Sequence, residues 1–412
     1  MTYCAWTRRE FLRCSASCGA FMVGSAFVAP STSASLLSDA AGDSTPIAEL
    51  IRNAPRARFW TSTANAAASC AACHAPGALA QDAKPAHAKT LVRCQLCARN
   101  CTLAEGERGV CRARIHVNGE LRSLVYGRPI SVHVDPIEKK PFYHFLPGSS
   151  AYSLATSGCP LRCKFCQNWE ISQARPEDYQ TPSVSPESVA RSAAERHAPV
   201  IAFTYNEPTV FAEYLLDIAH AAKLEKIRTA LVSCGYMNEA PLAEMCSVLD
   251  AIKIDLKGFS ADFYRNVSGA ELAPVLRSIR QVAKSRCHLE LVNLVVPTLN
   301  DAPGMTTELA KWVAGEAGPD VPLHFTRFHP DYQLPNLAPT PVATLERSRE
   351  LAMRQGLRFV YVGNVPGHPG NQTYCPGCGA IVVEREGFVV VTVRLKNGRC
   401  PSCKRSIPGV WS

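Results

Sequence analysis

The sequence has no long uninterrupted apolar run and no extended block of basic residues, and both absences narrow its function. The apolar run at residues 19–29 is too short for a helix that spans a bilayer. Basic residues form nothing longer than short pairs such as Lys139-Lys140, although the formal net charge is +9. No internal repeat is visible. The sequence therefore favours neither a membrane-spanning protein nor a nucleic-acid-binding protein.

Cysteine, by contrast, is abundant. The chain has 19 cysteines in 412 residues, and most of them are bunched as C-x2-C or C-x3-C pairs. Such bunching suits metal binding better than long-range disulfides. A disulfide framework belongs to small secreted domains with a weak core, whereas this chain is 47% hydrophobic. We therefore expect metal sites.

The first 90 residues lie ahead of the main folding pattern. Residues 1–35 join Thr7-Arg8-Arg9-Glu10-Phe11-Leu12 to an apolar run, which is typical of a twin-arginine export signal; a disordered basic tail is the alternative. Residues 36–90 predict a linker, poorly ordered and with one short helix. Within it, Cys70, Cys73 and His74 have the form of a c-type haem attachment site. An extra thiol pair or a chance match is the preferred interpretation.

From residue 151 onward, short apolar or β-branched runs alternate with helical stretches. This alternation is typical of βα units in a parallel sheet. Ser185-Pro186-Glu187 is a readable helix start, with Ser185 as the cap. The sequence predicts an α/β fold, a partial (β/α) barrel of the TIM type over residues 151–368. The expected strands are residues 152–156, 200–205, 228–233, 251–256, 288–296, 323–328 and 359–362.

A three-thiol loop directly follows the first expected strand. Cys159, Cys163 and Cys166 form a C-x3-C-x2-C pattern with no adjacent fourth ligand. A closed structural zinc site needs four ligands, whereas a 4Fe-4S cluster held by three cysteines leaves one iron open. A zinc or disulfide cluster is the alternative, but the spacing and the position after a strand favour the open cluster.

This loop resembles that of the radical S-adenosylmethionine (SAM) superfamily. The resemblance implies that the open iron chelates SAM, and that one-electron reduction then cleaves SAM to methionine and a 5′-deoxyadenosyl radical. That radical abstracts hydrogen from a substrate. The resemblance also implies that Phe165, just before the third cysteine, packs near the adenine.

The ends of later strands resemble the SAM-binding segments of this superfamily. Thr204-Tyr205-Asn206-Glu207-Pro208 looks like its Gly-Gly-Glu-Pro segment, which implies that Asn206 and Glu207 face the SAM amino group. Residues 232–236 resemble the Asn-Gly turn of activating enzymes with Cys234 in place of asparagine, which leaves a SAM contact there to Ser233 or to backbone groups. Asp255 and Lys257 match the Asp-Leu-Lys segment of glycyl-radical activating enzymes, which implies contact with SAM and the substrate loop. The alternatives are that Glu207 only caps a helix and that Asp255 and Lys257 lie on a solvated edge.

Two further residues have weaker indications. Cys234 stands where activating enzymes have asparagine, and a small buried thiol is its preferred interpretation over a fourth metal ligand. His329 is a substrate-side candidate, with a structural role as the alternative.

Two more thiol sets flank the expected barrel. In residues 369–412, paired C-x2-C motifs separated by two alternating stretches predict a zinc ribbon, although iron can bind the same ligands: Cys375, Cys378, Cys400 and Cys403. In residues 91–150, four thiols within eighteen positions predict a metal module that holds zinc or a second iron-sulfur cluster: Cys94, Cys97, Cys101 and Cys111.

Several stretches together resemble the radical SAM member of the AmmeMemoRadiSam system, a relative of pyruvate formate-lyase activating enzyme. They are residues 92–97, 135–141, 144–148, 166–169 and 407–411. The resemblance covers residues 92–412. It implies a low-potential donor, flavodoxin or ferredoxin, and Memo-type and AMMECR1-type proteins as candidate partners. It also makes Glu138, Lys139 and His144 candidates to cover the cluster and touch substrate.

The leading hypothesis is therefore a radical SAM enzyme, an oxidoreductase that acts on a protein glycine or a small molecule. The alternative is an exported electron-transfer or metal-binding protein without radical chemistry. The export-like signal favours the alternative, because SAM and low-potential reductants are cytoplasmic. The open three-thiol site favours the enzyme, and the compartment stays open.

Overall fold

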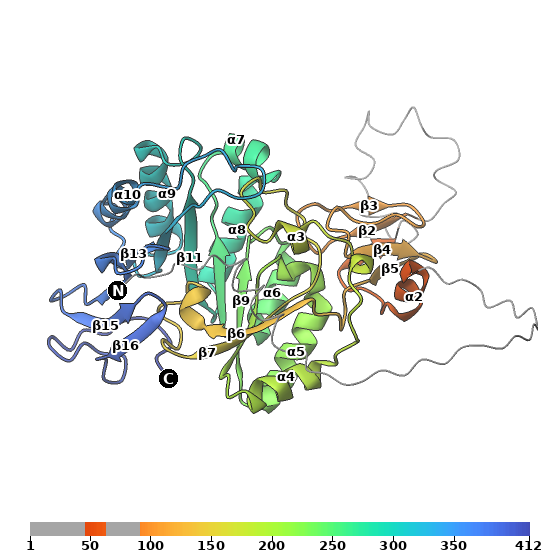
Figure 1. Ribbon diagram of the computed structural model, residues 1–412, viewed down its shortest axis with the longest axis horizontal. Coiled ribbons are helices and arrows are strands. Elements are labelled where there is room, and N and C mark those ends of the chain that lie inside the picture. The colour runs from red at the N-terminus through yellow and green to blue at the C-terminus, as the bar shows by residue number, and fades with distance from the viewer. Residues whose placement is uncertain (1–45, 63–90) are drawn as a thin grey trace, which may run out of the picture. The chain divides into compact units, whose positions relative to one another are not determined.

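The computed structural model describes residues 46–62 and 91–412 of the chain (Figure 1). The export-signal-like segment at residues 1–35 and the Cys70, Cys73 and His74 motif lie outside the described residues. Across the two described ranges, the helices are too short or too polar to cross a bilayer.

A small module precedes the main sheet. Its strands form a three-stranded antiparallel sheet, β1-β2-β3, and a separate hairpin, β4-β5. The elements are α2 (Pro46–Asn53), β1 (Trp60–Ser62), β2 (Val92–Cys94), β3 (Thr102–Leu103), β4 (Arg114–Val117) and β5 (Glu120–Ser123).

Residues 46–62 belong to this module, which corrects one boundary of the linker predicted over residues 36–90. The one short helix of that prediction is α2, and β1 then pairs with β2. Leu50 of α2 and Ala54, directly after it, are buried against Ile115 and Leu124 of the hairpin region. Burial of apolar surface therefore attaches this segment to the Cys-rich module.

The centre of the chain is an eight-stranded sheet in the order β13-β12-β11-β10-β9-β8-β7-β6. All neighbours pair in parallel except β6, which runs antiparallel to β7. The strands are β6 (Ser131–Pro136), β7 (Ser150–Ala155), β8 (Val200–Phe203), β9 (Arg228–Ser233), β10 (Ala251–Asp255), β11 (His288–Val295), β12 (Leu323–Arg327) and β13 (Val360–Gly363). The predicted α/β fold with a mostly parallel sheet is confirmed. The two end strands, β6 and β13, do not pair with each other in the described part of the chain, so the sheet is open.

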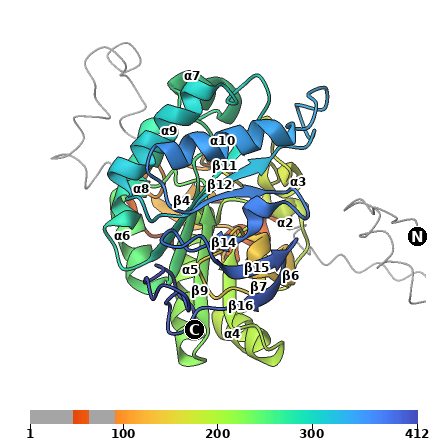
Figure 2. The same ribbon diagram turned by 90° about the vertical axis from the view of Figure 1, so that its left-hand side faces the viewer.

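Helices connect the parallel strands and cover them from outside, as Figure 2 shows for α8, α9 and α10. Ser185 caps α4 by accepting a hydrogen bond from the Ser188 N–H at 3.2 Å, with Pro186 in the first turn, as predicted. The α-helices are α3 (Trp169–Ser172), α4 (Pro186–Glu195), α5 (Ala212–Leu224), α6 (Glu239–Val248), α7 (Ala261–Phe263), α8 (Leu272–Ala283), α9 (Pro303–Glu316) and α10 (Val342–Arg354). Shorter turns are η3 (Ile137–Lys139), η4 (Pro176–Asp178), η5 (Pro208–Phe211), η6 (Tyr264–Ser268) and η7 (Pro369–Asn371).

An aromatic plug fills the amino end of the sheet. Phe142 and Phe145 pack against small side chains near the starts of four neighbouring strands, which are Ala151, Val200, Ala230 and Ala251. The small residues leave the room that the two aromatic rings occupy. The segment at residues 137–148 therefore closes the amino end of the sheet.

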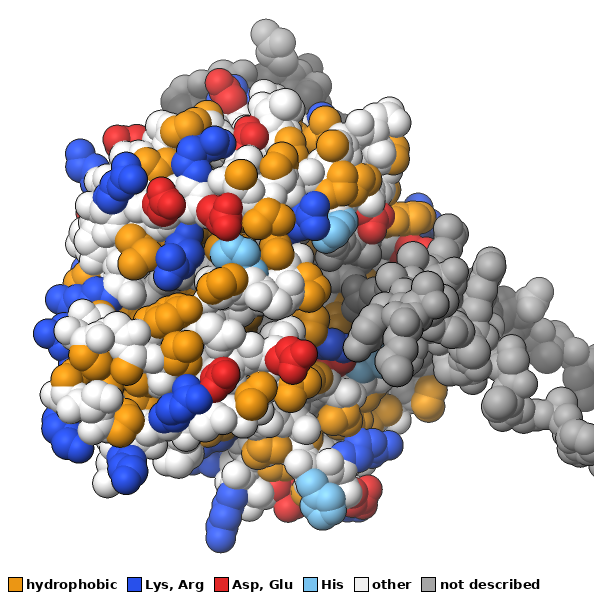
Figure 3. All heavy atoms as spheres, turned by 60° about the vertical axis from the view of Figure 1, so that its left-hand side comes forward, with side chains coloured by type: hydrophobic (Ala, Val, Ile, Leu, Met, Phe, Trp, Pro, Cys, Tyr) orange, Lys and Arg blue, Asp and Glu red, His pale blue; other side chains and the backbone are white. Residues whose placement is uncertain are grey.

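The C-terminal module is a small antiparallel sheet, β14-β15-β16. Its strands are β14 (Thr373–Tyr374), β15 (Ile381–Glu386) and β16 (Val389–Val393), which matches the predicted strand pair. Val382 and Ile407 pack against Phe359 and Tyr361 beside the start of β13. Figure 3 shows basic and acidic side chains interspersed on the face that it draws.

Candidate active site

The loop at residues 156–168 leaves the carboxyl end of β7 and carries the three predicted ligands, Cys159, Cys163 and Cys166. The Arg162 N–H donates to the Ser268 carbonyl at 2.9 Å. The Asn206 side-chain amide donates to the Gly158 carbonyl at 2.8 Å. Elements from two other places in the chain therefore hold the loop in its conformation.

The three thiols are suited to ligate a metal. Burial raises the pKa of each thiol, and it raises that of Cys163 to about 11 although Lys257 acts in the opposite direction. The Leu161 N–H donates to Cys159 Sγ at 3.4 Å. A buried thiol that resists ionisation becomes a thiolate when a metal replaces its proton. The donor set thus fits a cluster bound through this loop.

Asn206 follows β8 and faces this loop. Its amide nitrogen is used by Gly158, but its Oδ1 is buried and has no hydrogen-bond partner among the described residues. Buried polar atoms are nearly always paired, so such an oxygen marks a place where a donor is expected. The predicted position of Asn206 at a ligand site agrees with this observation.

Glu207 has a different role in the described chain. Its carboxylate accepts hydrogen bonds from Thr209 Oγ1 at 2.6 Å, from Ser233 Oγ at 2.7 Å and from the Cys234 N–H at 2.7 Å. It also caps η5 through the Thr209 N–H. Glu207 therefore caps the turn after β8 and also ties the end of β8 to the end of β9. Ser233 is brought to the site through Glu207.

Tyr205 is a residue of the site that sequence analysis does not single out. It stands where the superfamily segment has glycine, and it adopts φ 72°, a conformation that glycine favours. Its hydroxyl donates to Asp135 Oδ2 at 2.7 Å, and Asn168 donates to its carbonyl at 2.7 Å. The replacement of glycine by Tyr205 was the signal that sequence analysis could have used, because the backbone at this position is left-handed and glycine is the usual residue there.

Asp255 lies between two lysines at the carboxyl end of β10. Lys253 and Lys257 both pair with it, the latter at 3.2 Å. Burial acts to raise the pKa of Asp255, but the two ammonium groups outweigh it and lower the pKa to about 2. The Lys257 ammonium also lies 5.6 Å from the centre of the Phe165 ring. Asp255, Lys257 and Phe165 therefore meet beside the loop, and the side chains of Asp255 and Lys257, the residues of the solvated-edge alternative, are 29% and 14% exposed.

Four other candidates have no described contact with the three thiols. His144 is buried beneath the C-terminal module, where its ring nitrogens contact the Pro408 carbonyl and the Tyr361 hydroxyl, each at 2.6 Å. Glu138 is buried beside Arg385. The expectation that these two residues cover the cluster is wrong, because the 137–148 segment packs at the amino end of the sheet. Lys139 pairs with Asp135, and His329 is exposed after β12.

The four thiols of the C-terminal module lie close enough together to bind one metal ion. Their four sulfur atoms all lie within 4.8 Å of one another, with Cys375 to Cys403 at 3.4 Å and Cys378 to Cys400 at 3.6 Å. Four thiolates at ~2.3 Å from one zinc ion lie ~4 Å apart, so this geometry fits a single metal ion. In the described residues, no other group of three or more potential ligands is as close.

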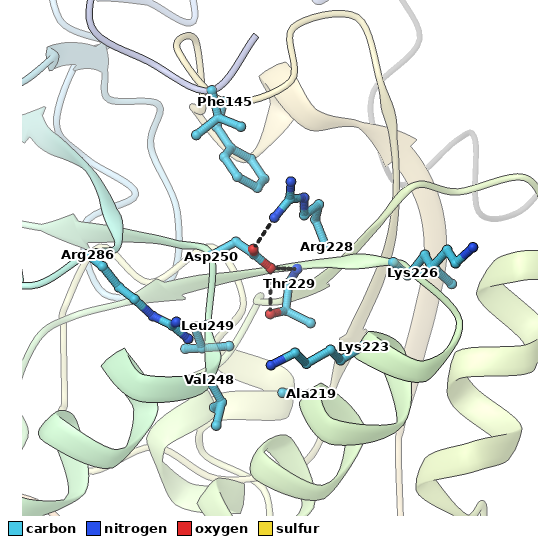
Figure 4. A pocket seen from close by; sticks show the side chains of 12 residues that line it. Phe145, Ala219, Lys223, Lys226, Arg228, Thr229, Val248, Leu249, Asp250 and Arg286 are labelled. Atoms are coloured by element: carbon cyan, nitrogen blue, oxygen red, sulfur yellow. Dashed lines mark hydrogen bonds and ion pairs between the residues drawn. The ribbon is translucent and has the colours of Figure 1, made fainter. Parts of the chain in front are cut away.

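A basic pocket of about 560 Å³ lies at the opposite end of the strands (Figure 4). Arg228, at the start of β9, pairs there with Asp250 at 2.8 Å, and Lys223 and Arg286 line the same pocket. Because parallel strands place the cluster loop at their carboxyl ends, this pocket is not part of the loop site.

A mostly parallel sheet whose carboxyl end carries a three-thiol loop and convergent polar groups defines a metal-dependent α/β enzyme. Residues 153–310 match the family described as the Radical SAM superfamily. The uncharacterized protein MJ0808 of Methanocaldococcus jannaschii is 42% identical over 318 residues, covering 77% of this chain and 95% of that protein. The chain belongs to the radical SAM superfamily, whose members use a 4Fe-4S cluster and SAM.

More distant relatives are activating enzymes. The pyruvate formate-lyase-activating enzyme of Staphylococcus epidermidis is 22% identical over 235 residues, covering 52% of this chain and 90% of that protein. A solved domain of a pyruvate-formate lyase-activating enzyme from Bacteroides vulgatus is 16% identical, with a TM-score of 0.36, and covers 40% of this chain and 98% of that chain.

Proposed function

We propose that this enzyme cleaves SAM reductively at a cluster held by Cys159, Cys163 and Cys166, and that it abstracts hydrogen from a protein glycine or a small molecule. When bound, the cluster and SAM supply a 5′-deoxyadenosyl radical. The observation that carries the proposal is the buried, unpaired Asn206 Oδ1 beside a loop with three thiols.

Each polar group around the loop has a separate role in binding SAM. Asn206 Oδ1 accepts a hydrogen bond from the SAM amino group. Glu207 holds Ser233 and the Cys234 backbone in place, so its contribution to SAM binding is mainly positional. Phe165 packs near the adenine, and Lys257 beside it favours the ligand's carboxylate. Asp255 keeps Lys257 charged and oriented.

The finer assignment is the radical SAM member of the AmmeMemoRadiSam system, with Memo-type and AMMECR1-type proteins as candidate partners. Its support is the resemblance of residues 92–412 described above. A flavodoxin or ferredoxin is the expected electron donor, and zinc is the expected metal of the C-terminal module.

The test is anaerobic reconstitution with iron and sulfide, followed by SAM and dithionite, with 5′-deoxyadenosine measured by chromatography. We expect Cys163→Ala to abolish the product while the C-terminal metal stays bound. Cys246→Ala is the matched control, because Cys246 is a buried thiol of α6 outside the three thiol sets. No product from a fully loaded wild-type protein would refute the proposal.

A further inference from the structure

The four thiols of the N-terminal module converge on one place. Cys94, at the end of β2, donates its backbone N–H to the Cys101 carbonyl at 2.9 Å. A side chain built at Gly109 would lie 3.6 Å from Cys111 Sγ and 3.8 Å from Cys101 Sγ. A hairpin and a glycine turn therefore bring thiols from separate parts of the module together.

The fourth thiol, Cys97, lies in the connection between β2 and β3, between Cys94 and Cys101. The Asn100 N–H donates to the Cys97 carbonyl at 3.0 Å, which closes a turn between these two thiols. Cys94 is buried, and the other three thiols are half-buried. Four thiols held in this way offer a complete ligand set for a metal centre.

The spacing distinguishes this set from the C-terminal module. Among residues 46–62 and 91–412, the C-terminal thiols are the one group of three or more potential ligands whose atoms all lie within 4.8 Å of one another. Thiolates around one ion must be that close, whereas an iron-sulfur cube binds each thiolate through a different iron and holds them farther apart. The C-terminal thiols therefore have the spacing of a single-ion site, whereas neither the N-terminal thiols nor the SAM-loop thiols form such a group.

The N-terminal module lies directly against the SAM loop. A side chain at Gly158 would overlap the Cys111 carbonyl, so the backbones beside Cys111 and Cys159 are in contact. The Arg162 guanidinium joins the two segments, since it donates to the Cys159 carbonyl at 2.9 Å and to the Val110 carbonyl at 2.6 Å. Val110 is 42% exposed, so the module reaches solvent next to the loop.

We propose that Cys94, Cys97, Cys101 and Cys111 bind a second iron-sulfur cluster, fully ligated by protein, which delivers electrons to the SAM loop. A low-potential flavin or iron-sulfur carrier is oxidised by one electron at this centre, and the same electron reduces the cluster of the loop, so no other reactant is consumed. The delivery role rests on the proposed SAM cleavage, whereas the presence of the cluster does not.

The presence of the cluster is tested by metal analysis after anaerobic reconstitution. We expect about eight iron atoms per chain in the wild type, and about four when Cys159, Cys163 and Cys166 are all replaced by alanine. Retained iron in that triple variant supports the second cluster even if SAM cleavage is never observed. An iron-free triple variant, or one with an extra zinc ion at the N-terminal thiols, overturns the proposal.

A double variant, Cys97→Ala with Cys101→Ala, tests the ligands and the route. Cys246→Ala with Cys287→Ala is its control, because both thiols are buried and lie outside the three sets. We expect the N-terminal variant to lose about half its iron while it keeps the C-terminal zinc, which reports on folding. With a flavodoxin-type donor, its rate of 5′-deoxyadenosine formation falls by about tenfold or more, whereas with dithionite the rate stays within about twofold. Equal losses with both reductants overturn the delivery role, and unchanged iron overturns the site.

Discussion

Replacement of Asn206 by alanine should separate SAM binding from cluster binding. The variant loses an acceptor, Oδ1, that is buried and unpaired among the described residues, and a donor that holds the Gly158 carbonyl at 2.8 Å. A hydrogen bond to a charged donor such as the SAM ammonium contributes about 1.5–3 kcal/mol, which corresponds to roughly 10- to 150-fold in Kd. The lost bond to Gly158 should lower the free energy of unfolding by about 1 kcal/mol.

The assay is anaerobic equilibrium dialysis of SAM against the reconstituted protein, with iron content measured in parallel. Asn168→Ala is the matched control, because it removes a bond of the same kind, to the Tyr205 carbonyl at 2.7 Å, but no unpaired acceptor. We expect the control to change the Kd for SAM by less than about threefold. If Asn206→Ala binds SAM as tightly as the control at equal iron content, the role given to Oδ1 is wrong.

Three further predictions concern packing, pH and metal. Gly158→Ala should lower the free energy of unfolding by more than about 3 kcal/mol, because the new side chain meets the Cys111 carbonyl. Gly106→Ala is the control: it has a similar φ but open space around it, and should lower the free energy of unfolding by about 1 kcal/mol. Equal losses of stability in urea titration would contradict this reasoning. Burial raises the pKa of Glu138 from 4.5 to about 7, so the folded state holds that proton more tightly and the free energy of unfolding should fall by about 3 kcal/mol as pH rises through this window. Glu138→Gln should remove that part of the pH dependence. Cys378→Ser should release the C-terminal metal and lower the melting temperature at unchanged iron content; retained metal would exclude the four-thiolate site.

Much of the fold follows from patterns that are local in the sequence. The seven predicted strands from residue 152 to residue 362 all form, with bounds shifted by two residues at most. Strand β6 is not predicted, because Val132 and Val134 are exposed on an edge strand and do not mark a buried face. The position of residues 137–148 was also predicted wrongly. Their charged residues suggested contact with the cluster, whereas Phe142 and Phe145 anchor the segment at the amino end of the sheet.

By itself, the sequence indicated which chemistry the chain carries, because ligand spacing is a local property: Cys159, Cys163 and Cys166, the proposed cluster ligands, lie on one loop. Only the tertiary structure decided which residues from distant segments contact one another at the site. Glu207 is hydrogen-bonded to Ser233, Asn206 Oδ1 is buried without a partner among the described residues, and Gly158 packs against the Cys111 carbonyl. These contacts join residues far apart in the chain, and their geometry depends on how the sheet brings strand ends together.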